Sequence, residues 1–146
     1  MKTFAPANIL LPKNVAFEKW AVIACDQFTS QPEYWQRVRE NVGEEVSTLN
    51  LVFPEAELNV DRVERIKSIN ENMVKYLAAD LFAEYQDAYI YVERTLKNGV
   101  VRKGIVGVID LEQYNYNADS KSAIRATEQT VLERIPPRVE IRRNAS

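Results

Sequence analysis

The stretch from Ser120 to Ser146 contains the side chains best suited to hold an anion. Arginine guanidinium groups donate paired hydrogen bonds to phosphate or carboxylate, and serine and threonine hydroxyls can add further donors. The stretch has six lysine or arginine residues and three glutamates, and the whole chain has a formal charge of −2, so the remainder carries −5. This separation predicts a surface that faces a small anionic ligand or another part of a protein. The residues that we predict to bind an anion are Arg125, Thr127, Glu128, Thr130, Arg134 and Arg138.

A helix is expected within residues 123–134, ahead of a break at Ile135-Pro136-Pro137-Arg138. If this helix begins near Ser122, its first backbone amides would be free to bind an anion. The competing interpretation is a solvated helix in which Glu128 and Arg134 pair with neighbouring side chains. Residue types alone leave both interpretations open.

Asp26 is the candidate for a catalytic carboxylate. It follows a short apolar run, Trp20–Cys25, which we predict to be a strand, and ligands of α/β sheets often bind beyond such strand ends. A carboxylate there could act as a base or as a Mg²⁺ ligand, but aspartate is also a common turn residue that bonds to its own backbone. No glycine-rich loop follows to cradle phosphates. Cys25 has no basic neighbour in the sequence and is expected to be a buried, unreactive thiol.

Composition excludes several kinds of site. The chain has no histidine and one cysteine among 146 residues, which rules out Ser-His-Asp and Cys-His catalysis and zinc sites of the Cys/His type. No aspartate-rich loop has the spacing of a Ca²⁺ or Mg²⁺ site, so we expect no metal within this chain. No apolar run approaches the ~20 residues of a membrane span. We therefore expect a cytoplasmic protein that binds no membrane and, given its acidic balance, no nucleic acid.

Hydrophobic patterning predicts an α+β fold with elements in the order βαβαββα around a mixed sheet and two to three packing helices. A second strand is expected at Thr48–Phe53, and helices are expected after Ser30 and from Asp61 to about Asp80. The later helix has the clearest apolar stripe. The chain is expected to be a single domain over residues 1–146 or the N-terminal part of a longer protein.

A β-hairpin is expected at about residues 88–110, turning at Asn98-Gly99. A two-residue turn would place Arg94 opposite Lys103. A three-residue turn pairs Glu93 with Lys103 instead, although it sets Arg94 opposite Arg102. We therefore favour the three-residue turn, with Gly99 in the left-handed conformation. Two further glycines interrupt the second strand and predict a bulge or a close backbone approach there.

Several segments resemble the domain-of-unknown-function 1015 family of bacterial and archaeal proteins. The resemblance is carried by Trp20–Trp35, Tyr91–Thr95, Gly104–Asp110 and Ile124–Thr130, together with Glu133, Arg134 and Arg138. Members of that family are much longer, so the resemblance implies that this chain corresponds to their N-terminal part. It also implies that the basic segment, residues 120–146, faces the part that follows.

A more distant similarity links the family to ParB-like proteins, some of which are free-serine kinases. It implies that the longer protein is a nucleotide-dependent phosphotransferase for a serine-like small molecule, with a nucleotide and Mg²⁺ as cofactors. The predicted arginines would then hold an anionic group, and the fragment alone would be inactive. Many relatives have Arg-His-Glu where this chain has Ala126-Thr127-Glu128, so no role of that histidine transfers. The competing hypothesis is a non-catalytic interaction module whose basic segment docks a partner or the rest of the protein.

Overall fold

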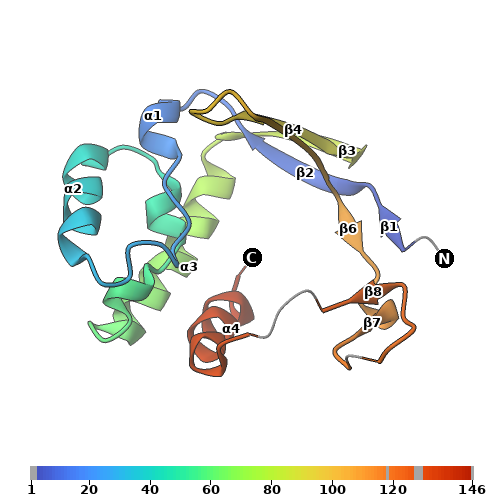
Figure 1. The fold of residues 1–146 in the computed structure, drawn as a ribbon. Helices are drawn as coiled ribbons and strands as arrows, with labels where there is room; N and C mark the ends of the chain where they lie inside the picture. Colours follow the sequence, from blue (N-terminus) through green and yellow to red (C-terminus); the bar gives the residue numbers. More distant parts are fainter. Residues whose placement is uncertain (1–2, 118, 127–129, 146) are drawn as a thin grey trace. The chain divides into compact units, whose positions relative to one another are not determined.

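The computed structural model describes residues 3–117, 119–126 and 130–145. The chain divides into two compact units, each made of two separate stretches. We call the first, Met1–Leu11 with Ala83–Gln129, the β unit, and the second, Pro12–Phe82 with Thr130–Ser146, the helical unit. Helices and small sheets occupy separate parts of the chain (Figure 1), which confirms the predicted α+β class.

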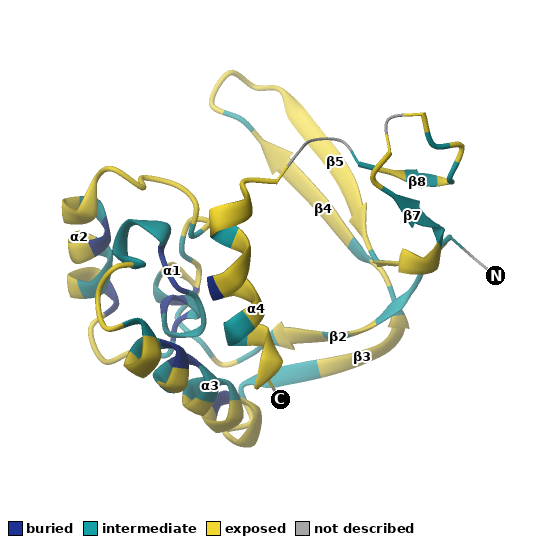
Figure 2. Cartoon of the chain, turned by 90° about the horizontal axis from the view of Figure 1, so that it is seen from below, coloured by how far each residue is buried: buried dark blue, intermediate teal, exposed yellow. Residues whose placement is uncertain are grey.

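The helical unit contains the hydrophobic core. Its helices are α1 (Phe17–Trp20), α2 (Pro32–Val42), α3 (Arg62–Ala78) and α4 (Ile135–Arg143), with 3₁₀ turns η1 (Thr48–Leu51), η2 (Glu55–Glu57) and η4 (Leu132–Arg134). One buried cluster joins α2 to η1, and a second joins α3 to Phe53 and to Ile141 of α4. The dark blue, buried residues in Figure 2 lie on these helices and the segments between them. The members of the two clusters are Trp35, Val42 and Leu49, and Phe53, Ile66 and Ile69.

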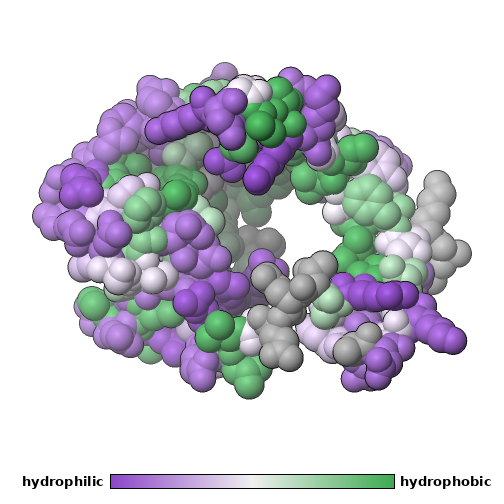
Figure 3. Space-filling model, in the orientation of Figure 1, coloured by the Kyte–Doolittle hydropathy of each residue, from purple (hydrophilic) through white to green (hydrophobic). Residues whose placement is uncertain are grey.

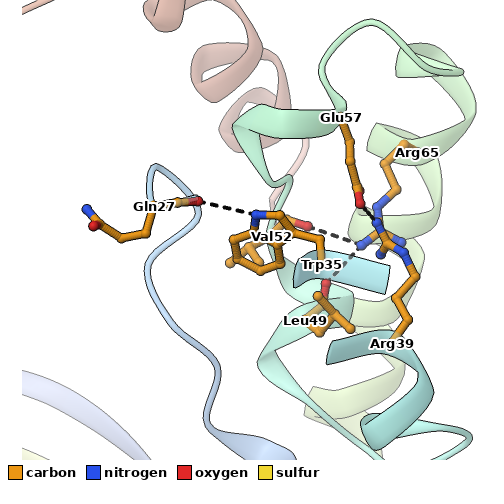
Figure 4. Close-up of polar contacts among 7 residues, drawn as sticks. All are labelled: Gln27, Trp35, Arg39, Leu49, Val52, Glu57 and Arg65. Atoms are coloured by element: carbon orange, nitrogen blue, oxygen red, sulfur yellow. Dashed lines mark hydrogen bonds and ion pairs between the residues drawn. The ribbon is translucent and has the colours of Figure 1, made fainter. Parts of the chain in front are cut away.

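Two polar side chains of this core, those of Ser47 and Trp35, are paired with backbone. The buried Ser47 donates its backbone amide to the Tyr76 hydroxyl at 3.1 Å, and its Oγ accepts from the Leu49 amide at 3.2 Å. The Trp35 indole donates to the Gln27 carbonyl at 3.2 Å, as Figure 4 shows. These bonds fix the irregular segments against α2 and α3, because an unpaired buried polar group would cost free energy.

Two predicted strands are wrong. Trp20 ends α1, and the residues after it, Ala21–Ala24, have no regular secondary structure. The Trp20 carbonyl accepts from the Thr48 hydroxyl at 2.7 Å, so a side chain takes the place of a neighbouring strand. The predicted strand Thr48–Phe53 begins instead with the turn η1, and the Ser47 side chain accepts from the backbone amide of Leu49, the second residue of that turn. Short apolar runs such as these are buried in any conformation, so their pattern does not distinguish a strand from a turn.

The helix predicted within residues 123–134 is not found in the described part of that range, apart from the 3₁₀ turn η4, and residues 127–129 lie outside the described residues. Ile124 and Arg125 form a short strand, β8, that pairs in parallel with β7 (Tyr114–Asn115). The helix α4 begins at Ile135 and has Pro136 and Pro137 in its first turn. The amides of a first turn have no partner within a helix, so prolines begin this helix where we expected a break.

The β unit consists of strands joined by short turns. Its pairs are β1 (Phe4–Ala5) with β6 (Val108–Ile109), β2 (Ala7–Pro12) with β3 (Phe82–Ala88), β4 (Ile90–Thr95) with β5 (Val101–Val106), and β7 with β8. The turn η3 (Leu111–Gln113) leads into β7. No described residue of this unit is buried, and Figure 2 draws its described residues in yellow and teal. The predicted mixed sheet is therefore several two-stranded sheets, with both antiparallel and parallel pairs.

The register of the hairpin β4–β5 confirms the three-residue turn. Glu93 lies opposite Lys103, with 3.6 Å between the carboxylate and the ammonium, and Arg94 lies opposite Arg102. Gly99 has φ 82° and donates its amide to the Leu96 carbonyl at 2.9 Å. A side chain would be strained in that conformation, so glycine sets the turn and the turn sets the register.

Gly107 is predicted to be the position in the β unit least tolerant of a side chain. A Cβ there would lie 2.6 Å from the Ala5 carbonyl oxygen and 2.7 Å from the Phe4 ring, whereas a Cβ at Gly104 meets nothing within 4 Å. We expect Gly107→Ala to weaken the pairing of β1 with β6 by about 1–3 kcal/mol, as overpacking does. Hydrogen exchange of the Asp110 amide, which donates to the Thr3 carbonyl at 3.1 Å, measures this. Gly104→Ala is the control and should leave that exchange rate unchanged.

Candidate functional site

Arg134 and Arg138 lie together because they are four residues apart at the junction of η4 and α4, and such positions share one helix face. Both point at a single carboxylate. Arg134 Nε lies 3.1 Å from Glu55 Oε2, and Arg138 Nη2 lies 2.7 Å from Glu55 Oε1. Arg134 thus pairs with a carboxylate that is distant in the sequence, whereas Glu128 lies outside the described residues.

Glu55 is held firmly between the two arginines. It follows the fully buried Pro54, and its backbone amide donates to the Cys25 carbonyl at 2.8 Å. Its side chain is only 6% exposed, while those of Arg134 and Arg138 are 43% and 49% exposed. Two guanidinium groups therefore share one carboxylate, which leaves a net charge of +1 and N–H donors on the exposed side of both arginines.

Asp26 and Cys25 belong to the same neighbourhood. Burial raises the pKa of the Cys25 thiol, the nearby Arg138 charge opposes that rise, and the Asp26 and Glu55 carboxylates add to it. Asp26 itself is exposed, and its Oδ1 accepts a hydrogen bond from Gln27 Nε2 at 3.3 Å. Cys25, Asp26, Glu55 and Arg138 thus form one cluster of polar groups, within which Asp26 faces solvent.

Cys25 is predicted to react slowly as a nucleophile. A raised pKa leaves less thiolate at every pH below it, and the thiolate is the reactive form. We expect iodoacetamide at pH 8 to alkylate the folded chain several-fold more slowly than it alkylates the chain unfolded in urea. Mass spectrometry over time measures both rates. Alkylation of the folded chain at the same rate or faster would contradict a raised pKa of the Cys25 thiol.

The other predicted anion-binding residues are placed as follows. Arg125 lies in β8 of the β unit, where its Nε donates to the Ser122 carbonyl at 3.5 Å. Thr130 is exposed in the helical unit, just before η4. Thr127 and Glu128 lie outside the described residues. Of the predicted set, the structure brings Arg134 and Arg138 together, and their role in binding an anion stays a prediction.

Sequence reasoning missed Glu55, the residue that organises this cluster. It lies 83 positions from Arg138, and no spacing rule connects residues so far apart. The one local signal is Pro54 before a short acidic turn, which does not reveal what the carboxylate contacts.

Within residues 3–117, 119–126 and 130–145, no three cysteine, aspartate or glutamate side chains come together to hold a metal ion. None of the helices described in that part of the chain has the length and apolar character needed to cross a bilayer.

Comparison with known families decides the relationship of this chain. The model of the family described as "Protein of unknown function (DUF1015)" matches residues 5–146. The chain belongs to this family. The match to DUF1015 includes residues of both units. Because the family is of unknown function, membership assigns no reaction to the chain. Comparisons of this DUF1015 chain with curated proteins and with solved structures gave no match.

Proposed function

We propose that the chain is a binding module and that its β unit carries the binding surface. The observation behind this proposal is that no described residue of the β unit is buried, although the unit is rich in large apolar side chains. Figure 3 shows apolar side chains, in green, at the surface of the strands. Large exposed apolar patches on a protein commonly mark sites of interaction with a partner.

The surface has the features of a protein-binding site. Phe4 and Tyr89 stack with 5.4 Å between ring centroids, and with Tyr91 and Ile105 they line a cavity of about 380 Å³. Their exposed fractions are 42%, 47%, 59% and 64%. Aromatic side chains of this type anchor protein interfaces because they bury much area at a low cost in conformational entropy. A two-stranded hairpin such as β4–β5 is also marginal in water by itself, so a covering partner would stabilise it.

We propose that this surface is covered by the part of the same polypeptide that follows this region in the longer proteins that the chain resembles. The β unit has seven basic and seven acidic residues and therefore no net charge. A neutral unit with exposed apolar side chains favours an apolar protein surface as its partner over a nucleic acid. Several charged side chains of residues 120–146 already have partners within the chain, because Arg134 and Arg138 pair with Glu55, and Glu140 pairs with Arg62. We therefore place the docking face on the β unit and not on these charges.

Hydrogen exchange tests this proposal. The amides of β4 and β5 should exchange at least tenfold more slowly in the longer polypeptide than in the 146-residue chain. Ile105→Lys should remove most of that protection. Val63→Lys is the control, because Val63 is 84% exposed on α3 of the helical unit. Equal exchange in both polypeptides, or protection of the 146-residue chain by formation of a dimer, would rule out the stated occupant.

A second candidate function is binding of a small anion by Arg134 and Arg138, with phosphate transfer from a nucleotide and Mg²⁺ to a serine-like molecule in the longer protein. It is favoured by the excess charge of the two half-exposed guanidinium groups and by the nearby Asp26 carboxylate. Inorganic phosphate, or ATP with Mg²⁺, should then raise the melting temperature, and Arg138→Gln should abolish the rise. Arg142→Gln removes an equal charge from an exposed position of α4 and should not. No rise for either anion would leave the interaction module as the sole candidate.

We propose the cytoplasm as the location. The support is compositional, because one cysteine among 146 residues cannot form an internal disulfide. Fractionation of cells that express the protein, with the thiol state of Cys25 measured by alkylation, tests this location.

A further inference from the structure

A second pair of arginines lies in the helical unit, away from any residue that sequence reasoning selected. Arg39 comes from α2 and Arg65 from α3, and Figure 4 shows their guanidinium groups side by side. Glu57, from η2, forms an ion pair with Arg39 Nη2. Arg65 Nη2 donates to the carbonyls of Leu49 at 2.9 Å and Val52 at 3.2 Å. Each guanidinium group is thus fixed, one by a carboxylate and one by backbone.

These groups line a cavity of about 440 Å³, within the size range of small-molecule sites. Its wall is mainly apolar. Phe53, at 4% exposure, forms part of the interior surface, and Val60, at 63% exposure, lies nearer to solvent. Asp61 completes the lining and precedes the first turn of α3. The cavity therefore combines an apolar wall with two guanidinium groups and two carboxylates, those of Glu57 and Asp61.

The cationic groups are short of acceptors. Arg65 Nε is enclosed, and among the residues that the structure describes it has no hydrogen-bond partner. Burial lowers the pKa of both guanidinium groups, and the charge of Arg65 lowers the pKa of Arg39 further. Both effects disfavour the charged form of the two guanidinium groups, which lie close together with one directly paired carboxylate. An anion bound between them would therefore be stabilised.

We propose that this cavity binds a small organic monocarboxylate, with its carboxylate between Arg39 and Arg65 and its apolar body against Phe53 and Val60. Guanidinium groups match the geometry of a carboxylate, and the added charge relieves the repulsion between them. The carboxylates of Glu57 and Asp61 lie in the same lining and disfavour a phosphate dianion. The site shares no residue with the Glu55 cluster or with the β unit, so the binding would be independent of the function proposed above.

Titration of the 146-residue chain with benzoate tests the inference, because benzoate has one carboxylate on a flat apolar body. Benzamide has the same shape without the charge, and inorganic phosphate has the charge without the apolar body. We expect saturable chemical-shift changes at the amides of Arg39 and Arg65 with benzoate, at least tenfold weaker binding of benzamide, and no saturable binding of phosphate at these amides.

Three variants locate the binding. Arg39→Gln and Val60→Asp should each weaken benzoate binding about tenfold, the first by removing a donor and the second by placing a negative charge at an exposed edge. Val60→Asp changes an exposed side chain, so it keeps the test valid if Arg39→Gln fails to fold. Arg37→Gln is the matched control, because it removes the same charge from an exposed position two residues away on α2. Absence of saturable benzoate binding, equal binding of benzamide, or equal loss in Arg37→Gln would overturn the assignment.

Discussion

Trp35→Ala is expected to lower the free energy of unfolding of the helical unit by about 4 kcal/mol, near the middle of the range for large-to-small substitutions in a core. Trp35 is fully buried and packs with Val42 and Leu49. Its ring also meets that of Tyr34 edge to face, with 5.5 Å between centroids. Alanine would lose this packing and leave a cavity that the two neighbouring 3₁₀ turns cannot readily fill.

Urea unfolding followed by far-ultraviolet circular dichroism measures this loss. Trp35→Phe is the informative control, because it keeps an aromatic ring but removes the donor to the Gln27 carbonyl at 3.2 Å. We expect an intermediate loss for it, since the ring fills most of the space and the carbonyl loses one partner. A loss below about 1 kcal/mol for Trp35→Ala would mean that the core around α2 is not packed as described.

Glu55→Gln is expected to lower the free energy of unfolding by about 2 kcal/mol, less than the loss for a fully buried ion pair because both arginines are half exposed. The carboxylate is 6% exposed and accepts from Arg134 and Arg138. Glutamine keeps the shape of the side chain but removes the charge that both guanidinium groups share. The attachment of α4 to η2 would weaken as a result.

Glu140→Gln is the matched control for this prediction. Glu140 accepts from Arg62 at 2.6 Å and 3.0 Å but is 43% exposed, and exposed ion pairs contribute about 0–1 kcal/mol. Thermal denaturation of both variants at low and high salt separates the two cases. A loss for Glu55→Gln no larger than that for Glu140→Gln would show that the buried position of Glu55 adds nothing to stability.

Local signals predicted the parts of the fold that local interactions decide. The apolar stripe of α3 was expected to end near Asp80 and the helix ends at Ala78, because residues three and four apart already define a buried face. The hairpin register followed from Gly99 and from the charges at Glu93 and Lys103. In both cases the residues that determine the structure are close together in the sequence.

The failures arose where distant contacts decide the backbone. The carbonyl of Trp20 is satisfied by the hydroxyl of Thr48, 28 residues away, so its segment needs no neighbouring strand. Pro136 and Pro137 stand in the first turn of α4, and Ile141 of that helix packs on the second core cluster, a contact that the local sequence does not reveal. Arginines of the candidate site could be selected by residue type, but Glu55, their partner, could be found only in three dimensions.

The division of the helical unit into two stretches has a consequence for how the chain is made. Phe82 ends its first stretch and Thr130 begins its second, so the longer stretch of the β unit, Ala83–Gln129, is synthesised between them. At the usual rate of translation, several seconds pass before α4 leaves the ribosome. Until then Glu55 lacks both arginines, and the cluster around Phe53 lacks Ile141. The helical unit of a nascent chain therefore stays unfinished, with part of its core open to chaperones, while strands β3 to β8 are being made.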